Sequence, residues 1–261
     1  MNRIDVKLNE LKKENKKALI TFLTAGDGGY EVTKRAVLEM ERAGADIIEI
    51  GVPFSDPIAE GPVIQNADKR SIDAGTTLMG IFEMVKRLRK ETDMPLLLMM
   101  YLNSIYRFGC ERFFSLCNEC GIDGVIVPDM PYEERDEIEE YCEKYNVHSI
   151  SLVAPTSKDR IEKIVKEAKG FIYCVSSTGV TGMRDKFSTD FEEFFGQIKK
   201  YASVPCAVGF GISTAEQAKE IKKYCDGIIV GSAVVNILAQ EDENRYARLS
   251  DFVCSLRRAL D

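Results

Sequence analysis

Apolar and polar residues form two different patterns along this chain, and segments of the two patterns alternate from one end to the other. Short runs rich in β-branched residues are separated by longer segments in which charged residues recur with a helical period. Such alternation is typical of repeated βα units around a parallel sheet. Strands are therefore predicted at residues 19–24, 46–51, 95–101, 124–127, 149–153, 171–175, 205–209 and 227–230.

The segments between these strands have the pattern of amphipathic helices, with charged residues on one side and apolar residues on the other. Examples lie at 30–43, 81–90, 111–120, 133–145, 158–168, 190–201 and 214–224. Eight strands alternating with helices predict an α/β fold, the (β/α)8 TIM barrel. A further helix is predicted near the N-terminus, at about 4–13, where it would plug the floor of the barrel.

A doubly wound open sheet is the rival architecture. It predicts a Gly-x-Gly-x-x-Gly fingerprint at the first βα turn, whereas residues 24–29 read Thr-Ala-Gly-Asp-Gly-Gly. Several units also share a Gly and an Asp just before the strand, as in Ala-Gly-Ala-Asp at 43–46 and Cys-Gly-Ile-Asp at 120–123. Because a Gly just past a helix supplies a left-handed cap, this recurrence supports the count of βα units, and the absence of the fingerprint favours the barrel. No linker divides the chain, so one domain at 1–261 is predicted.

The composition narrows the class of protein. The chain has 261 residues, and 45% of them are hydrophobic, which is ample for a buried core. With 35 Lys and Arg against 42 Asp and Glu, its net charge of −7 does not suit a nucleic-acid partner. The start of the chain lacks an export signal, and the longest apolar stretch, 95–102, is far shorter than the roughly 20 residues of a membrane span. We therefore expect a cytoplasmic protein with reduced cysteines and no membrane partner.

Glu49 is the polar residue that stands out in the predicted strands. It lies among apolar neighbours near the C-terminal end of the second strand, where barrel enzymes place their active sites. A carboxyl group buried there would have a raised pKa and could act as both acid and base near neutral pH. The alternative is an outward-facing Glu paired with a helix Lys. In loop 2 (53–62), Asp56 and Glu60 are further candidates, although Asp56 could simply form an Asx turn.

Two short glycine motifs follow the last two strands, Gly209-Phe-Gly-Ile-Ser and Gly231-Ser-Ala. Both loops can offer backbone N–H groups, and many barrels bind a phosphate group there. A phosphorylated substrate is therefore expected. Loop 6 (176–186) contains glycines and hydroxyl groups that suit a mobile lid, although a solvated surface loop would have the same composition.

Several absences narrow the chemistry. None of the predicted strands contains Lys, which argues against an aldolase that works through a Schiff base on a strand. The single His, His148, stands at the barrel floor, where a structural role is expected. Cys117 and Cys120 form a C-x-x-C pattern, but their helix places such residues in the core. No metal site is expected. Acid–base chemistry without a cofactor, on a phosphorylated substrate, remains.

Taken together, these stretches make the chain resemble the tryptophan synthase alpha chain family over essentially the whole barrel. The resemblance rests on motifs that occur in order: Thr21-Phe-Leu-Thr-Ala-Gly-Asp, Glu49-Ile-Gly-Val-Pro-Phe-Ser-Asp-Pro, Gly61-Pro-Val-Ile-Gln, Gly124-Val-Ile-Val-Pro-Asp, Leu152-Val-Ala-Pro-Thr, Tyr173 through Gly182, Ala207-Val-Gly-Phe-Gly-Ile-Ser and Val230-Gly-Ser-Ala. It implies a lyase that cleaves indole-3-glycerol phosphate to indole and glyceraldehyde 3-phosphate. It also implies an α2β2 assembly with a beta subunit, which receives the indole and holds the pyridoxal phosphate; no cofactor is implied for this chain.

The resemblance also implies roles for individual residues. Glu49 matches the family's acid–base residue, and Glu60 stands where the family has an Asp that serves the indole nitrogen. The matches to phosphate contacts are Gly182, Phe210, Gly211, Gly231 and Ser232. The matches to the indole pocket and lid are Phe22, Ile64, Leu98, Tyr101, Tyr173 and Thr181.

Two other functions stay open at this point. The chain could be a lyase that releases free indole without a partner, because such an enzyme would share these active-site residues. It could also be a barrel that binds and controls its partner after the change from Asp to Glu60, one methylene longer, had impaired catalysis.

Overall fold

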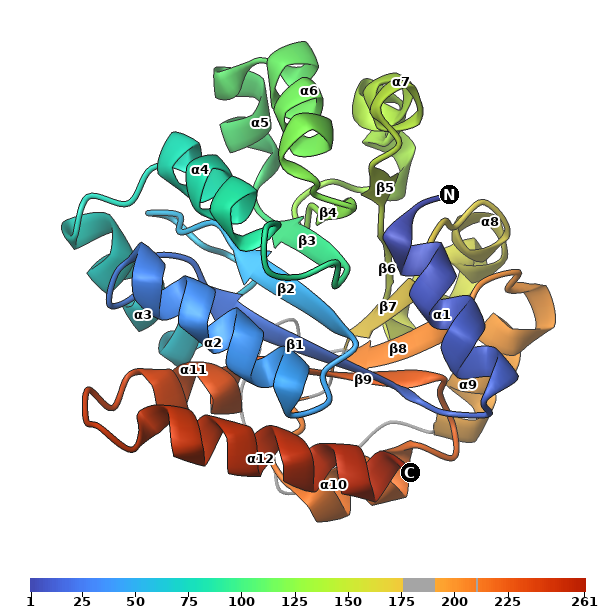
Figure 1. Cartoon of the computed structure of the whole chain (residues 1–261). Helices are drawn as coiled ribbons and strands as arrows, with labels where there is room; N and C mark the ends of the chain where they lie inside the picture. The colour runs from blue at the N-terminus through green and yellow to red at the C-terminus, as the bar shows by residue number, and fades with distance from the viewer. Residues whose placement is uncertain (176–190, 210) are drawn as a thin grey trace.

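The computed structural model describes residues 1–175, 191–209 and 211–261. Within these residues, short parallel strands form one continuous sheet in the order β5-β4-β3-β2-β1-β9-β8-β7-β6 (Figure 1). The strands are β1 (Ala18–Thr24), β2 (Ile47–Gly51), β3 (Leu96–Met99), β4 (Gly124–Ile126), β5 (His148–Ser149), β6 (Ser151–Val153), β7 (Ile172–Val175), β8 (Cys206–Gly209) and β9 (Gly227–Val230).

The two ends of this sheet belong to one stretch of chain. Only Ile150 separates β5, which pairs with β4, from β6, which pairs with β7. The predicted fifth strand is therefore present but interrupted at Ile150, and the sheet curls into a nearly closed barrel, which confirms the predicted fold. The predicted third strand is too long by two residues at its end, because β3 stops at Met99 and Tyr101 already caps the next helix.

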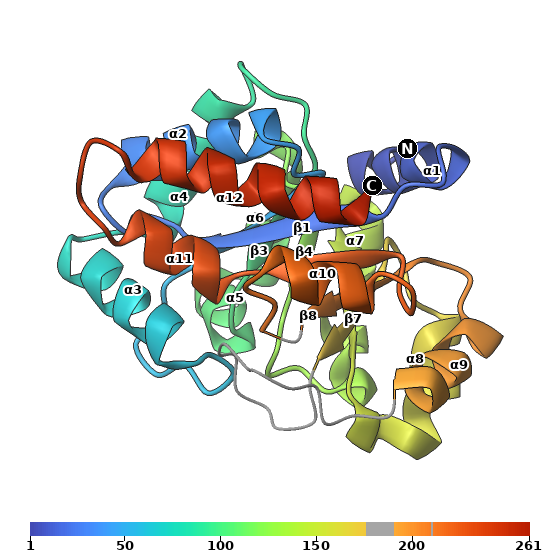
Figure 2. The ribbon, with the colours of Figure 1, turned by 90° about the horizontal axis from the view of Figure 1, so that it is seen from below.

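Helices surround the barrel on its outer side, and α1 covers one of its ends (Figure 1). They are α1 (Arg3–Lys13), α2 (Tyr30–Arg42), α3 (Pro62–Asp73), α4 (Leu78–Leu88), α5 (Leu102–Phe108), α6 (Cys110–Cys120), η1 (Tyr132–Glu134), α7 (Asp136–Tyr145), η2 (Pro155–Arg160), α8 (Ile161–Lys166), α9 (Phe191–Tyr201), α10 (Ala215–Ile221), α11 (Ser232–Leu238) and α12 (Arg245–Leu260). The long α12 packs against α2, α10 and α11 beside β1 (Figure 2). None of the helices in the described ranges is long and apolar enough to cross a membrane.

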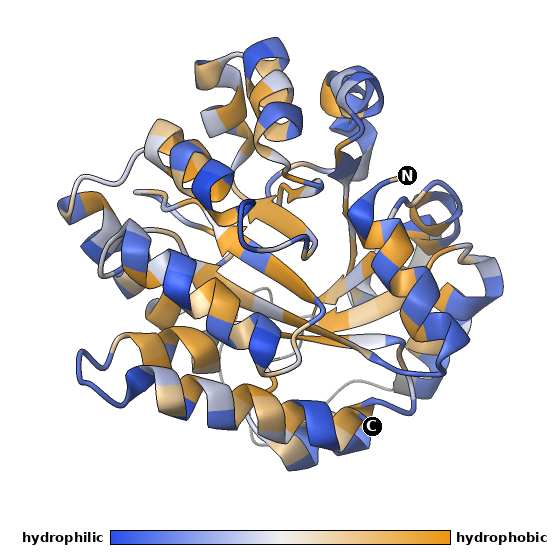
Figure 3. Cartoon of the chain, viewed as in Figure 1, coloured by the Kyte–Doolittle hydropathy of each residue, from blue (hydrophilic) through white to orange (hydrophobic). Residues whose placement is uncertain are grey.

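Most strands bury side chains on both faces, which explains why they are largely apolar (Figure 3). Inside the barrel, Ile20, Ile47 and Leu97 pack together. Between the strands and the helices lies a second apolar layer, which includes Ile48 and Leu98. Successive residues of a strand therefore belong to different layers, and a shift by one residue moves a side chain from one layer to the other.

The N-terminal helix α1 closes one end of the barrel, as predicted. It buries Ile4, Leu8 and Leu11 against the apolar residues inside the barrel. The side-chain oxygen of Asn2 accepts a hydrogen bond from the N–H of Ile4 and caps the helix. His148, at the start of β5, has its Nε2 atom 2.9 Å from Oδ2 of Asp5 on α1. The single histidine therefore helps to fasten the helix to the barrel floor.

Thr21 on β1 provides a test of the packing. Its side chain is fully buried, and its hydroxyl group has no hydrogen-bond partner among the described residues. Thr21→Val keeps the shape and removes the buried hydroxyl, so the free energy of unfolding should rise by about 1 kcal/mol. Urea denaturation measures this change. Thr24→Val is the matched control, because the Thr24 hydroxyl donates to Asp68 and its removal should not stabilise the chain. A less stable Thr21→Val variant would contradict the packing described here.

Candidate active site

Glu49 lies inside the barrel. It follows Ile47 by two residues on β2, so both side chains point to the interior, and Glu49 is 0% exposed. Neither carboxylate oxygen has a hydrogen-bond partner among the described residues. Burial raises the pKa of Glu49 from 4.5 to about 8, because the charged form is poorly solvated there. At neutral pH this carboxyl group is therefore protonated and can donate a proton. The alternative, in which Glu49 faces outward and pairs with a helix Lys, is wrong.

Glu60 lies at the end of loop 2, directly before α3, and is 6% exposed. The hydroxyl group of Tyr101 donates a hydrogen bond to its carboxylate. The same hydroxyl oxygen accepts hydrogen bonds from the N–H groups of Ile58, at 2.8 Å, and Ala59, at 2.9 Å. Burial is the main cause of the raised pKa of Glu60, and the hydrogen bond from Tyr101 opposes it. Tyr101 therefore fixes both the loop and the carboxylate that the loop carries.

Tyr173 on β7 lies near both carboxyl groups. Its ring is buried, and burial is the main cause of its raised pKa, followed by the charges of Glu49 and Glu60. All three side chains therefore face one region at the C-terminal ends of the strands. A pocket opens beside Tyr173, and the described residues that line it are Phe22, Ile64, Met99, Tyr173, Gly209, Gly211, Ile212, Ile229, Gly231, Ser232 and Ala233.

Two glycines make room for the aromatic rings in this region. A Cβ atom on Gly51 would lie 2.5 Å from the ring of Phe22, and one on Gly209 would lie 2.6 Å from the ring of Tyr173. Contacts this short are not tolerated, so any side chain at either position would displace a ring. The rings form apolar walls, which suit a flat aromatic ligand.

Three of the predicted phosphate contacts come together in the described structure. Gly211, Gly231 and Ser232 line the pocket, and α11 begins at Ser232. The first N–H groups of a helix have no acceptor within it and can bind an anion. The other predicted contacts and the lid residue, which are Gly182, Phe210 and Thr181, lie outside the described residues.

One predicted pocket residue is wrong. Leu98 is fully buried, but its side chain packs between the barrel and the helices, away from the pocket. Met99 lines the pocket instead. Every residue of β3 is apolar because both faces of the strand are buried, so the sequence pattern did not reveal which face each residue occupies. Among the other candidates, Asp56 is exposed in loop 2 and accepts a hydrogen bond from Ser55.

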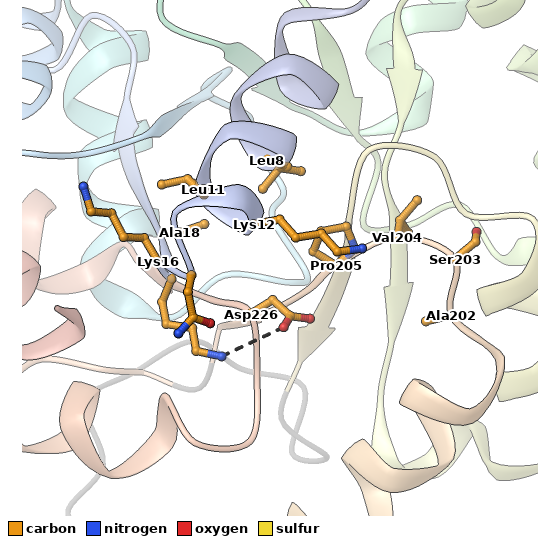
Figure 4. A pocket seen from close by; sticks show the side chains of 12 residues that line it. Leu8, Leu11, Lys12, Lys16, Ala18, Ala202, Ser203, Val204, Pro205 and Asp226 are labelled. Carbon is orange, nitrogen blue, oxygen red and sulfur yellow. Dashed lines mark ion pairs between the residues drawn. The ribbon is translucent and has the colours of Figure 1, made fainter.

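Another pocket lies at the opposite end of the barrel, between α1 and the starts of β1 and β8 (Figure 4). Lys17 and Asp226 both line it and form an ion pair, with Nζ and Oδ1 4.0 Å apart. It contains none of the predicted site residues. In the part of the chain that the structure describes, no group of three or more His, Cys, Asp or Glu residues is arranged to hold a metal ion.

The fold and the site define a class of protein. It is a (β/α)8 barrel whose buried interior carboxyl group suits acid–base chemistry and whose aromatic rings and glycine loops line a pocket at the same mouth. The sequence profile of the tryptophan synthase alpha chain matches residues 8–260. The chain belongs to this family.

Individual relatives agree with this assignment. A tryptophan synthase alpha chain from Caldanaerobacter subterraneus is 48% identical over 263 residues, which cover 100% of both chains. The solved alpha subunit of tryptophan synthase from Legionella pneumophila is similar with a TM-score of 0.89 and 36% identity, over 100% of this chain and 99% of that one. A chain of the tryptophan synthase complex from Pyrococcus furiosus is similar with a TM-score of 0.83 and 32% identity, over 92% of this chain and 98% of that one.

The reaction follows from the family. The chain is a lyase of tryptophan biosynthesis that cleaves indole-3-glycerol phosphate to indole and glyceraldehyde 3-phosphate, and the indole passes to a beta subunit.

Proposed function

We propose that Glu49 is both the acid and the base of this cleavage. Its protonated carboxyl group gives a proton to indole C3. The bond between C3 and the glycerol chain then breaks, and its electrons return to the indole ring. The hydroxyl group beside that bond loses its proton to Glu49 and becomes the aldehyde, so the carboxyl group ends as it began. The observation that carries this proposal is a fully buried carboxyl group without a hydrogen-bond partner in the described residues and with a pKa of about 8.

In this proposal, Glu60 supplies a negative charge that stabilises a positive charge on the substrate. Protonation of C3 makes the ring nitrogen cationic, and a carboxylate at the ring N–H stabilises that charge. Glu60 is one methylene longer than the Asp expected from the resemblance. Its hydrogen bond from Tyr101 holds the longer side chain in place. That contact supports a working site, although a misplacement of about 1 Å can cost on the order of 10²-fold in rate.

The remaining proposed contacts form two groups, one for the indole ring and one for the phosphate group. Phe22, Ile64, Tyr101 and Tyr173 would hold the indole ring, and Met99 takes the place predicted for Leu98. The phosphate group would bind the N–H groups of Gly211, Gly231 and Ser232, with Gly182 and Phe210 proposed from the resemblance and Thr181 as the lid residue.

The proposed partner is a beta subunit in an α2β2 assembly, and pyridoxal phosphate belongs to that partner. Two exposed apolar side chains at the mouth of the barrel support a docking surface there. Ile58 on loop 2 is 76% exposed, and Tyr106 on α5 is 42% exposed. The two elements are joined, because the N–H of Ile58 donates to Tyr101, the residue that precedes α5.

An assay of indole formation from indole-3-glycerol phosphate tests this function. The purified chain is measured alone and with added beta subunit, and the rate should rise severalfold when the partner is present. A full rate without the partner would instead identify a stand-alone lyase. No indole above background under either condition, with a substrate analogue still bound, would identify a barrel that only binds and controls its partner.

A further inference from the structure

Asp68 on α3 is a buried acidic residue that the cleavage does not use. It is 4% exposed, and Thr24 at the end of β1 donates a hydrogen bond to its Oδ1 atom at 3.4 Å. The backbone N–H of Phe54, near the start of loop 2, lies close enough to this carboxylate to lower its pKa. Asp68 therefore joins α3 to β1 by a hydrogen bond and faces the backbone at the start of loop 2.

The other part of loop 2 is held by Tyr101. Its ring stacks on the ring of Phe54, with centroids 4.6 Å apart and planes inclined by 22°. Its hydroxyl oxygen accepts from the N–H groups of Ile58 and Ala59, and the hydroxyl donates to Glu60. A continuous path of contacts thus runs from Asp68 through Phe54 and Tyr101 to the carboxylate of Glu60.

Asp68 also interacts electrostatically with Glu60, the carboxylate at the end of this path. Burial is the main cause that raises the pKa of Asp68 to about 7, and the charge of Glu60 is the next. Asp27 also raises this pKa, whereas the Phe54 N–H and the Thr24 hydroxyl lower it. Arg70, a cation on the same helix, forms two hydrogen bonds with Asp27, at 2.8 and 2.7 Å. Ionisation of Asp68 therefore places a second negative charge near Glu60.

We propose that Asp68 is a positioning residue, whose carboxyl group holds loop 2 through Phe54 and so sets Glu60 at the indole nitrogen. The inference rests on the proposed role of Glu60. It makes two demands on Asp68: a hydrogen-bond acceptor for the Phe54 N–H, and no charge that repels Glu60. An Asn at this position meets both demands, and an Ala meets only the second.

The test compares Asp68→Asn, Asp68→Ala and the wild type in the indole assay with the beta subunit present. Asp73→Ala is the matched control, since it removes an exposed carboxylate of the same helix. At pH 6, Asp68→Asn should keep the wild-type kcat. Asp68→Ala should lose about 10- to 100-fold in kcat with little change in KM, because the phosphate pocket is intact.

The pH profile separates positioning from a merely structural role. The ratio of kcat/KM for Asp68→Asn to that of the wild type should be close to 1 below pH 6 and should rise severalfold through pH 7, because only the wild type acquires the repelling charge. A ratio that is independent of pH would overturn the inference. So would equal kcat values for Asp68→Ala and the wild type. If the Ala variant does not fold, the ratio for the Asn variant still decides.

A double variant distinguishes this inference from the proposed role of Glu60. Asp68→Ala should cost much less in a Glu60→Gln background than in the wild type, because both changes act on one interaction. If Glu60→Gln alone leaves indole formation unchanged, the proposed role of Glu60 is wrong, and the inference falls with it. If Glu60→Gln impairs the reaction while Asp68→Ala does not, only the inference about Asp68 is wrong.

Discussion

Glu49→Gln is expected to lower kcat for indole formation by roughly 10²- to 10⁴-fold, the usual contribution of a general acid–base residue. The amide has nearly the same shape as the carboxyl group but cannot give a proton to C3. Since the phosphate pocket is unaltered, KM should change little. Steady-state release of indole, with the beta subunit present, measures both constants. Glu10→Gln, at an exposed position on α1, is the control and should leave both constants unchanged.

The pH dependence gives a second readout for the same residue. Burial raises the pKa of Glu49 to about 8, so the acid form that starts the reaction is present below this pH and is lost above it. The wild-type kcat/KM should therefore fall as pH rises through about 8. The residual activity of Glu49→Gln should lack this decrease. If Glu49→Gln retains more than about a tenth of the wild-type kcat, Glu49 is not the acid–base residue of the cleavage.

Glu60→Gln is expected to lower kcat by on the order of 10²-fold, comparable to the loss of one charge-stabilising group in other active sites. The amide can keep the hydrogen bond from Tyr101, so loop 2 should stay in place, but it has no negative charge for the ring nitrogen. Burial raises the pKa of Glu60, so its carboxylate forms only when the pH exceeds the ordinary pKa of a glutamate. The difference between wild type and variant should therefore grow with pH on the acid side.

The same assay supplies the contradicting result for Glu60. If Glu60→Gln forms indole at the wild-type rate while Glu49→Gln forms none, another group stabilises the ring nitrogen. Circular dichroism melting of both variants excludes a loss of fold as the cause.

Much of the fold could be predicted, because each βα unit carries its own apolar run and its own amphipathic helix. Helix α1 could be predicted for the same reason, whereas the pattern of β2 favoured an interior Glu49 without excluding an outward-facing one, because the strand is buried on both faces. The interruption of the fifth strand at Ile150 could not be predicted, because 149–153 reads as one strand. The choice between Leu98 and Met99 failed because β3 is apolar on both faces.

The contacts of loop 2 could not be predicted from local pattern either. Glu60 and Tyr101 are 41 residues apart in sequence, and Thr24 and Asp68 are 44 apart. Only the closure of the barrel brings them together, and no periodicity reports such pairs. The available signal for Asp68 was an Asp at helical spacing from Ile64 on an amphipathic helix, but such an Asp is equally consistent with a surface position.

The most direct test of the central claim is a titration of the Glu49 carboxyl group itself. Protein carrying glutamate labelled with ¹³C at the carboxyl carbon is titrated by NMR, and Glu49→Gln identifies the signal by its absence. A midpoint near pH 8 is predicted, because the buried carboxyl group lies among apolar side chains. A midpoint near the ordinary value of 4.5 would contradict the account, since the group would then be ionised at neutral pH and could not donate the proton.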